Sequence, residues 1–179
     1  MTPEHAQFLL HFLLPQLESE QSITQKIFTV VPREKQDYAP APKSKTAFEI
    51  ARHIAITESW LLDAVIRGGF EEIAPLPAAV DTCQRIAAWY AENFRRRVPM
   101  LRELSGGHLA TPVDFLGLRQ DPAVCYLNIA IRHSVHHRGQ LSAYLRPMGA
   151  KVPAIYVESA DEPYPAEEGS PSSAPPPCF

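Results

Sequence analysis

The sequence has few cysteines and no cysteine pair typical of a zinc site or a disulfide framework. Cys83, Cys125 and Cys178 are far apart, and no CxxC motif occurs. This usage is typical of a reducing compartment. No apolar run reaches the roughly 18 residues of a membrane span, and the N-terminal apolar stretch is interrupted by His11 and Pro15. We therefore expect a cytoplasmic protein without a signal peptide or a membrane-spanning segment.

An excess of positive charge is also missing. The formal net charge is −3, and Arg95–Arg97 is the only strong basic cluster. Proteins that bind nucleic acid or anionic membranes usually present a basic surface, so we expect neither as a partner. The partner that we expect besides a second copy of the chain is a small-molecule substrate.

Long runs of alternating polar and apolar residues are absent as well, and helical periodicity dominates. The 179 residues fit one domain plus a tail. Thr2-Pro3 and Asp121-Pro122 each resemble an N-cap followed by proline at the first helical position. We predict loops over 31–43, 70–80 and 107–120, and helices from Thr2 to about Val30 with a kink or break at Pro15, from Ser44 or Thr46 to Arg67, from near Asp81 to Leu101, and from Asp121 to Pro147.

Four amphipathic helices of this length predict an all-α fold, a four-helix bundle with long loops. The periodicity leaves the topology open. The composition changes beyond Tyr156, where proline and acidic residues replace the apolar pattern. We therefore expect a bundle over residues 1–157 and an acidic, proline-rich tail over 158–179 that is extended or disordered.

His133 and His137 lie four residues apart in the last predicted helix, so their side chains share one face. The two histidines of the HExxH motif bind one zinc ion with this spacing. Ser134 replaces the glutamate of that motif, so a protease-style general base is absent from it. Leu127 and Ile131 continue an adjoining apolar face. Both imidazoles should therefore point to the bundle interior or its mouth, where a metal would satisfy one nitrogen of each ring.

A third ligand has to come from another helix, and His53 is the candidate. It lies beside the apolar face of the second predicted helix, where a hydrogen-bonded, half-buried histidine is the alternative explanation. Spacing alone therefore leaves the three-histidine site open. The competing diiron site needs Glu-x-x-His on two helices, and this motif does not occur. We expect His108 to be exposed in a loop.

The string HSVHHRGQL at 133–141, together with HIAITESW at 53–60, resembles the DinB/YfiT-like superfamily. The resemblance covers about residues 1–157. It implies a four-helix bundle with an unusual crossover, frequent homodimerisation, and a divalent metal held by His53, His133 and His137. Family members with an assigned activity include S-transferases that use low-molecular-weight thiols and maleylpyruvate isomerase-like enzymes. Many others have no assigned reaction.

Three histidines with an open fourth position are typical of catalytic metal sites, whereas structural zinc is closed by four ligands. We therefore expect a metal-dependent enzyme, either a transferase that activates a thiol or a hydrolase that activates water. The alternative is a bundle that binds a metal or ligand without turnover. Zinc and nickel suit imidazole ligands best, with iron and manganese as further options. Gln140, Glu58 and Tyr144 are the candidates for supporting residues beside the metal.

Overall fold

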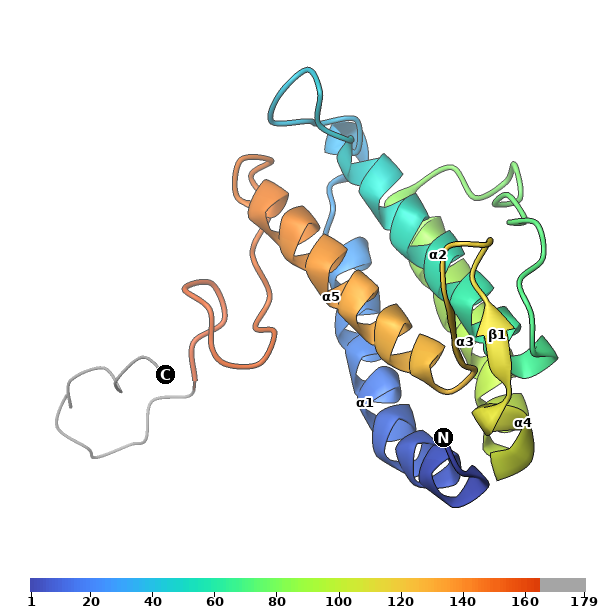
Figure 1. Cartoon of the computed structure of the whole chain (residues 1–179). Helices are drawn as coiled ribbons and strands as arrows, with labels where there is room; N and C mark the ends of the chain where they lie inside the picture. The colour runs from blue at the N-terminus through green and yellow to red at the C-terminus, as the bar shows by residue number, and fades with distance from the viewer. Residues whose placement is uncertain (165–179) are drawn as a thin grey trace, which may run out of the picture.

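The computed structural model describes residues 1–164, and residues 165–179 lie outside the described part of the chain. Four long helices form the body of the molecule (Figure 1). The predicted all-α four-helix bundle is confirmed. The elements are α1 (Pro3–Thr29), the 3-10 turn η1 (Arg33–Lys35), α2 (Ala47–Arg67), α3 (Cys83–Arg102), the short α4 (Gly106–Ala110), β1 (Pro112–Asp114), β2 (Gln120–Pro122) and α5 (Cys125–Leu145).

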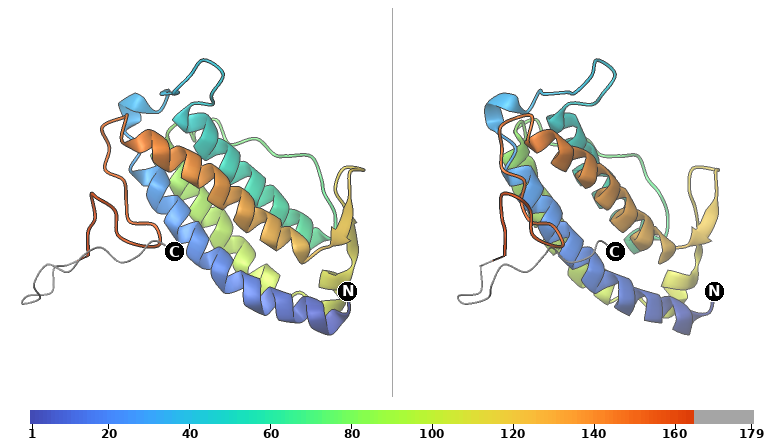
Figure 2. Two further views of the ribbon diagram at one scale, coloured as in Figure 1. Left: turned by 60° about the vertical axis from the view of Figure 1, so that its left-hand side comes forward. Right: turned by 90° about the vertical axis from the view of Figure 1, so that its left-hand side faces the viewer.

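Each long helix packs against two others. Helix α1 contacts α3 and α5, and α2 contacts the same two helices. Helices α1 and α5 run in one direction, and α2 and α3 run in the other (Figures 1 and 2). Because α2 and α3 are parallel, the connection over 68–82 has to return along the bundle, which accounts for its length. The antiparallel pair α2 and α5 carries the candidate site.

Local side-chain chemistry sets several helix ends. The Thr2 hydroxyl accepts a hydrogen bond from the first turn of α1, and Thr46 and Glu49 form a capping box at the start of α2. Gly68 ends α2 in the left-handed conformation that glycine adopts without a Cβ clash. The expected break at Pro15 is absent, since α1 is one helix through this position. Buried leucines on both sides of Pro15 pack against the same core and keep the two halves together.

The segment between α3 and α5 corrects our prediction of a loop over 107–120 and a helix beginning at Asp121-Pro122. Helix α4 and an antiparallel β1–β2 hairpin occupy this segment. Asp121 forms an ion pair with Arg119 instead of capping a helix. Helix α5 begins only at Cys125. The prediction was wrong because an Asp-Pro pair also suits a short edge strand, where proline costs little.

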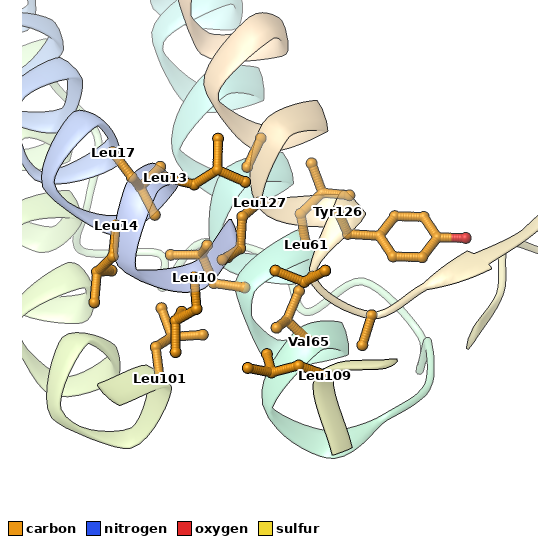
Figure 3. Close-up of a cluster of buried hydrophobic side chains, with 14 of the residues drawn as sticks. Leu10, Leu13, Leu14, Leu17, Leu61, Val65, Leu101, Leu109, Tyr126 and Leu127 are labelled. Carbon is orange, nitrogen blue, oxygen red and sulfur yellow. The ribbon is translucent and has the colours of Figure 1, made fainter. Parts of the chain in front are cut away.

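Two clusters of buried apolar side chains fill the bundle. The first joins the N-terminal half of α1 to the C-terminal half of α2, to α4 and to the start of α5 (Figure 3). The second lies toward the other end of the long helices. Along α5 the first cluster extends to Ala130 and the second begins at Leu141. The middle of α5, from His133 to Arg138, therefore lies between the two, and polar side chains enter the bundle there.

The residues after α5 pack back onto the bundle. Asp161 accepts a hydrogen bond from Arg146 at 2.9 Å, and Glu162 pairs with Lys26 of α1 at 2.6 Å. Residues 158–164, which we assigned to the tail, therefore contact the bundle. Our expectation for the rest of the tail lies outside the described residues. Within the described part of the chain, no helix combines the length and apolar character needed to cross a bilayer.

Candidate metal centre

Three histidines from two helices converge at the α2–α5 contact. His53 lies in the first half of α2, and His133 and His137 lie one turn apart on α5. The Nε2 atoms of His53 and His133 are 3.0 Å apart, and one nitrogen from each of the three rings lies within 4.8 Å of the others. All three rings are half-buried. The structure thus brings together the pair that spacing identified and the third residue that spacing left open.

The outer nitrogens of two of these rings contact side chains of the same helix. Nδ1 of His53 lies 3.3 Å from the Thr57 hydroxyl, and Nδ1 of His137 lies 2.9 Å from the Gln140 amide oxygen. An amide oxygen only accepts, so Nδ1 of His137 carries a proton and Nε2 is the nitrogen left for a metal. Partners of this kind orient metal-binding histidines in proteins. Nδ1 of His133 is buried and has no hydrogen-bond partner among the described residues.

The donor set fits a divalent metal ion. Zinc–imidazole bonds of about 2.0–2.1 Å place the nitrogens of a tetrahedral site roughly 3.3 Å apart, close to the 3.0 Å between His53 and His133. Burial lowers the pKa of His133 to about 4, and the neighbouring histidines add to the effect. Burial, followed by the charge of His137, also lowers the pKa of His53. Both imidazoles are therefore neutral near pH 7, which is the form that binds metals.

Of the three supporting candidates, Gln140 forms a hydrogen bond with a histidine of the group. It accepts the hydrogen bond from His137 and so sets the tautomer of the ring, a role different from the orientation of water or substrate. Tyr144 is 8% exposed and belongs to the second core cluster, where its ring meets Tyr38 edge-on at 5.7 Å. Glu58 is 1% exposed and faces the bundle interior. Within the described residues, neither Glu58 nor Tyr144 forms a hydrogen bond with the three histidines.

Glu58 instead forms the centre of a buried polar network between α2, α3 and α5. The Tyr90 hydroxyl donates to one carboxyl oxygen at 2.6 Å, and the Ser134 hydroxyl donates to the other. Desolvation raises the pKa of Glu58 to about 7, although these two hydrogen bonds and the charge of Arg138 act in the opposite direction. Ser134 directly follows His133. The network therefore ties the rotation of α5 about its axis to α2 and α3.

His136 and His108 are two of the four histidines outside the group of three. His136 is exposed, and its ring meets that of His137 edge-on at 4.7 Å. His108 was predicted to be exposed in a loop, but it lies in α4 and is half-buried. A nitrogen of its ring is 2.7 Å from the Val65 carbonyl oxygen. This contact satisfies a carbonyl of the last turn of α2, which explains the burial.

Our reading of the sequence missed Thr57 and two residues of the hairpin region. Thr57 is four residues after His53 and therefore on the same helix face, so its spacing could have identified it. Phe115 and Arg119 line the same cavity as His133. No short-range pattern in the sequence indicates that these two residues lie beside His133, because the hairpin that positions them was predicted to be a loop.

Comparison with known proteins agrees with this architecture. The sequence profile of the DinB family matches residues 6–169, which extends past the boundary that we expected at residue 157. The uncharacterized protein YjoA of Bacillus subtilis is 26% identical over 146 residues, covering 80% of this chain and 90% of the relative. The uncharacterized protein YrdA of the same organism is 29% identical over 160 residues, covering 87% and 92%.

Two solved structures have a similar fold. A DinB-like protein from Bacillus cereus superposes with a TM-score of 0.68 at 30% identity, covering 80% of this chain and 95% of the other. The DinB-like protein YjoA of Bacillus subtilis superposes with a TM-score of 0.64 at 22% identity, covering 78% and 92%. Because the family profile spans most of the chain and the fold agrees, this protein belongs to the DinB family.

Proposed function

We propose that this protein is a divalent-metal-dependent transferase that joins a small thiol to an electrophilic substrate. The observation that carries the proposal is the convergence of His53, His133 and His137 with no fourth His, Cys, Asp or Glu grouped with them in the described residues. Structural zinc sites are closed by four protein ligands, whereas catalytic sites keep one position for water or substrate. Three imidazoles without a fourth protein ligand in the described residues therefore suit a centre that takes part in a reaction.

A divalent ion in this site supplies positive charge that lowers the pKa of a thiol or a water in the remaining position. The chain contributes the geometry. Thr57 and Gln140 hold two of the imidazoles in the orientation that directs their Nε2 atoms inward. Buried Ser134 and Glu58 support the helix from the inner side. Zinc or nickel fits the all-imidazole donor set best, and iron or manganese is the next choice.

The surroundings favour a thiol over water as the nucleophile. Attack by water is usually assisted by a carboxylate base, as in the HExxH proteases. The neighbouring carboxyl group of Glu58 is buried and already bound by Tyr90 and Ser134, so it is not available for this role. A thiolate is a strong nucleophile and needs no such base. In the transfer, sulfur bonds to the electrophilic carbon, the leaving group departs with its electron pair, and the thiol proton goes to solvent.

Metal analysis and turnover together test the proposal. Protein reconstituted with zinc or nickel is analysed for metal content, then assayed with 2-mercaptoethanol and 1-chloro-2,4-dinitrobenzene, and separately with 4-nitrophenyl acetate. We expect one ion per chain and thiol transfer above the uncatalysed rate. Each of His53→Ala, His133→Ala and His137→Ala should lose the metal and the activity. His11→Ala, an exposed histidine of α1, is the matched control and should lose neither.

The outcomes separate the possible functions. Ester hydrolysis without thiol transfer would indicate a hydrolase. One ion per chain without turnover of any thiol or ester would indicate a bundle that binds a metal or a ligand. Equal metal content in the unmodified protein and all three histidine variants would refute the metal site itself.

A further inference from the structure

A cavity of about 480 Å³ lies beside His133, between α5 and the hairpin region. His133 belongs to both the cavity and the histidine group. Phe115 and Ile129 give the cavity an apolar part, and Arg119, Arg132 and His136 give it a basic part. Its volume is within the range of about 300–1,000 Å³ that is usual for small-molecule sites. A ligand in this cavity would therefore border the candidate metal position.

The cavity wall on the hairpin side is well supported. The Phe115 ring lies 5.1 Å from Phe70 and 5.8 Å from Trp60, within a group of aromatic rings that continues to Tyr126. The Phe115 backbone N–H donates to the Arg119 carbonyl at 2.8 Å. Both side chains are thus presented from a segment tied to the end of the bundle. Preorganised walls of this kind reduce the ordering cost of binding.

The charge in the cavity is positive and only partly balanced. None of its lining residues in the described part of the chain is acidic. Arg119 is paired with Asp121 of β2. Arg132 forms no ion pair or side-chain hydrogen bond with another described residue, and it is exposed on the same side of α5 as the cavity. A free guanidinium beside an apolar surface is complementary to a carboxylate on an apolar body, which it can bind through two parallel hydrogen bonds.

We propose that this cavity binds a small organic carboxylate, with Arg132 as the partner of the carboxylate and with Phe115 and Ile129 against the apolar body. The inference rests on the proposed function in one respect: the molecule bound there is a substrate of the metal-dependent reaction, with its reacting end beside His133. The proposed function does not specify this substrate class. Arg132 is a specificity-determining residue in this proposal.

A pair of matched probes tests the binding without any turnover. The affinities of 3-phenylpropionate and its neutral isostere 3-phenylpropionamide are measured by calorimetry or ligand-observed NMR. We expect the carboxylate to bind the unmodified protein about tenfold more tightly than the amide does. A difference of this size is typical of one hydrogen-bonded pair between a guanidinium and a carboxylate. Arg132→Gln should reduce this preference to less than about twofold. Arg96→Gln, on α3 and paired with Glu92, is the control and should keep it.

Repeating the measurement on metal-free protein separates this proposal from the proposed function. The preference for the carboxylate should survive in His137→Ala, because Arg132 and not the ion provides it. Metal-loaded, unmodified protein that shows the preference but catalyses no transfer would refute the proposed function and leave the carboxylate site intact. Equal affinities for the two probes in the unmodified protein, a preference that Arg132→Gln leaves unchanged, or a preference that disappears with the metal would each overturn the carboxylate site.

Kinetics then assign the carboxylate to one of the two substrates. If the thiol carries it, Arg132→Gln should raise KM for 3-mercaptopropionate about tenfold and leave KM for 2-mercaptoethanol unchanged. If the electrophile carries it, the same contrast should appear between 4-(bromomethyl)benzoate and benzyl bromide. Either pattern supports the proposal. Unchanged KM values for all four compounds would contradict it.

Discussion

Replacing Glu58 with glutamine isolates the cost of burying this carboxyl group. The amide has nearly the same shape as the neutral acid. It can accept the hydrogen bond from Tyr90 and donate one to the Ser134 hydroxyl, so the contacts of the buried network are retained. The substitution therefore removes the titration of the group and little else.

The size of the effect follows from the pKa. Burial raises the pKa of Glu58 from 4.5 to about 7. At about 1.4 kcal/mol per pKa unit, ionising the group costs about 3 kcal/mol more in the folded protein than in the unfolded chain. Because the folded-state pKa is raised, the stability contribution is fully present below pH 4.5 and is lost as the pH rises through about 7. Glu58→Gln should therefore match the unmodified protein near pH 4.5 and exceed it by about 3 kcal/mol near pH 8.

Urea unfolding of the metal-free protein at a series of pH values measures this difference. With a slope of about 2 kcal/mol per molar urea, the variant should unfold at about 1.5 M higher urea near pH 8. The titration of the histidines is common to both proteins and cancels in the comparison. Glu103→Gln changes an exposed carboxyl group and should alter stability by less than about 0.5 kcal/mol at each pH. A stability difference between Glu58→Gln and the unmodified protein that stays constant from about pH 5 to 8 would refute the reasoning.

Three further predictions concern the site and its supports. Gln140→Leu removes the acceptor for Nδ1 of His137 and should weaken metal affinity about 10–100-fold in a competition titration against a chelator; unchanged affinity would argue against this role. Arg138→Met leaves Glu20 without its buried partner and should lower the free energy of unfolding by about 2–3 kcal/mol, so an effect below about 0.5 kcal/mol would contradict the importance of this pair. The pKa of His133 is lowered from 6.5 to about 4, so its stability contribution is present above pH 6.5 and is lost as the pH falls toward 4. Acid titration of the metal-free protein should show this loss, and His133→Asn should reduce it.

The helices were predictable where short-range chemistry decides them. Thr46 and Glu49 can cap α2 because they are three residues apart, and Gly68 ends it because it tolerates the left-handed conformation. The hairpin was not predictable in the same way. Its strands are three residues each, too short to show an alternating pattern. They are aligned by pairing between residues six to ten positions apart, which an N-cap rule cannot detect.

In the candidate site, too, some residues could be predicted from short-range spacing and others could not. His133 and His137 could be paired from the sequence because the helical period places residues four apart on one face. The buried position of Glu58 was harder to predict from the sequence. It is five residues after His53, so it is rotated by roughly 140° around α2 and faces the interior instead of the candidate metal position. Only the packing of α2 against α3 and α5 shows what it meets there.

The sequence by itself determined the all-α class, most helix ends and the His133–His137 pair, because each depends on residues within one or two turns of a helix. The tertiary structure decided that α2 lies antiparallel to α5, which brings His53 from 80 positions away to within 3.0 Å of His133. It also decided that the hairpin borders the site and that Glu58 is buried. These features depend on contacts between distant segments, whose free energy is gained only when the whole bundle assembles.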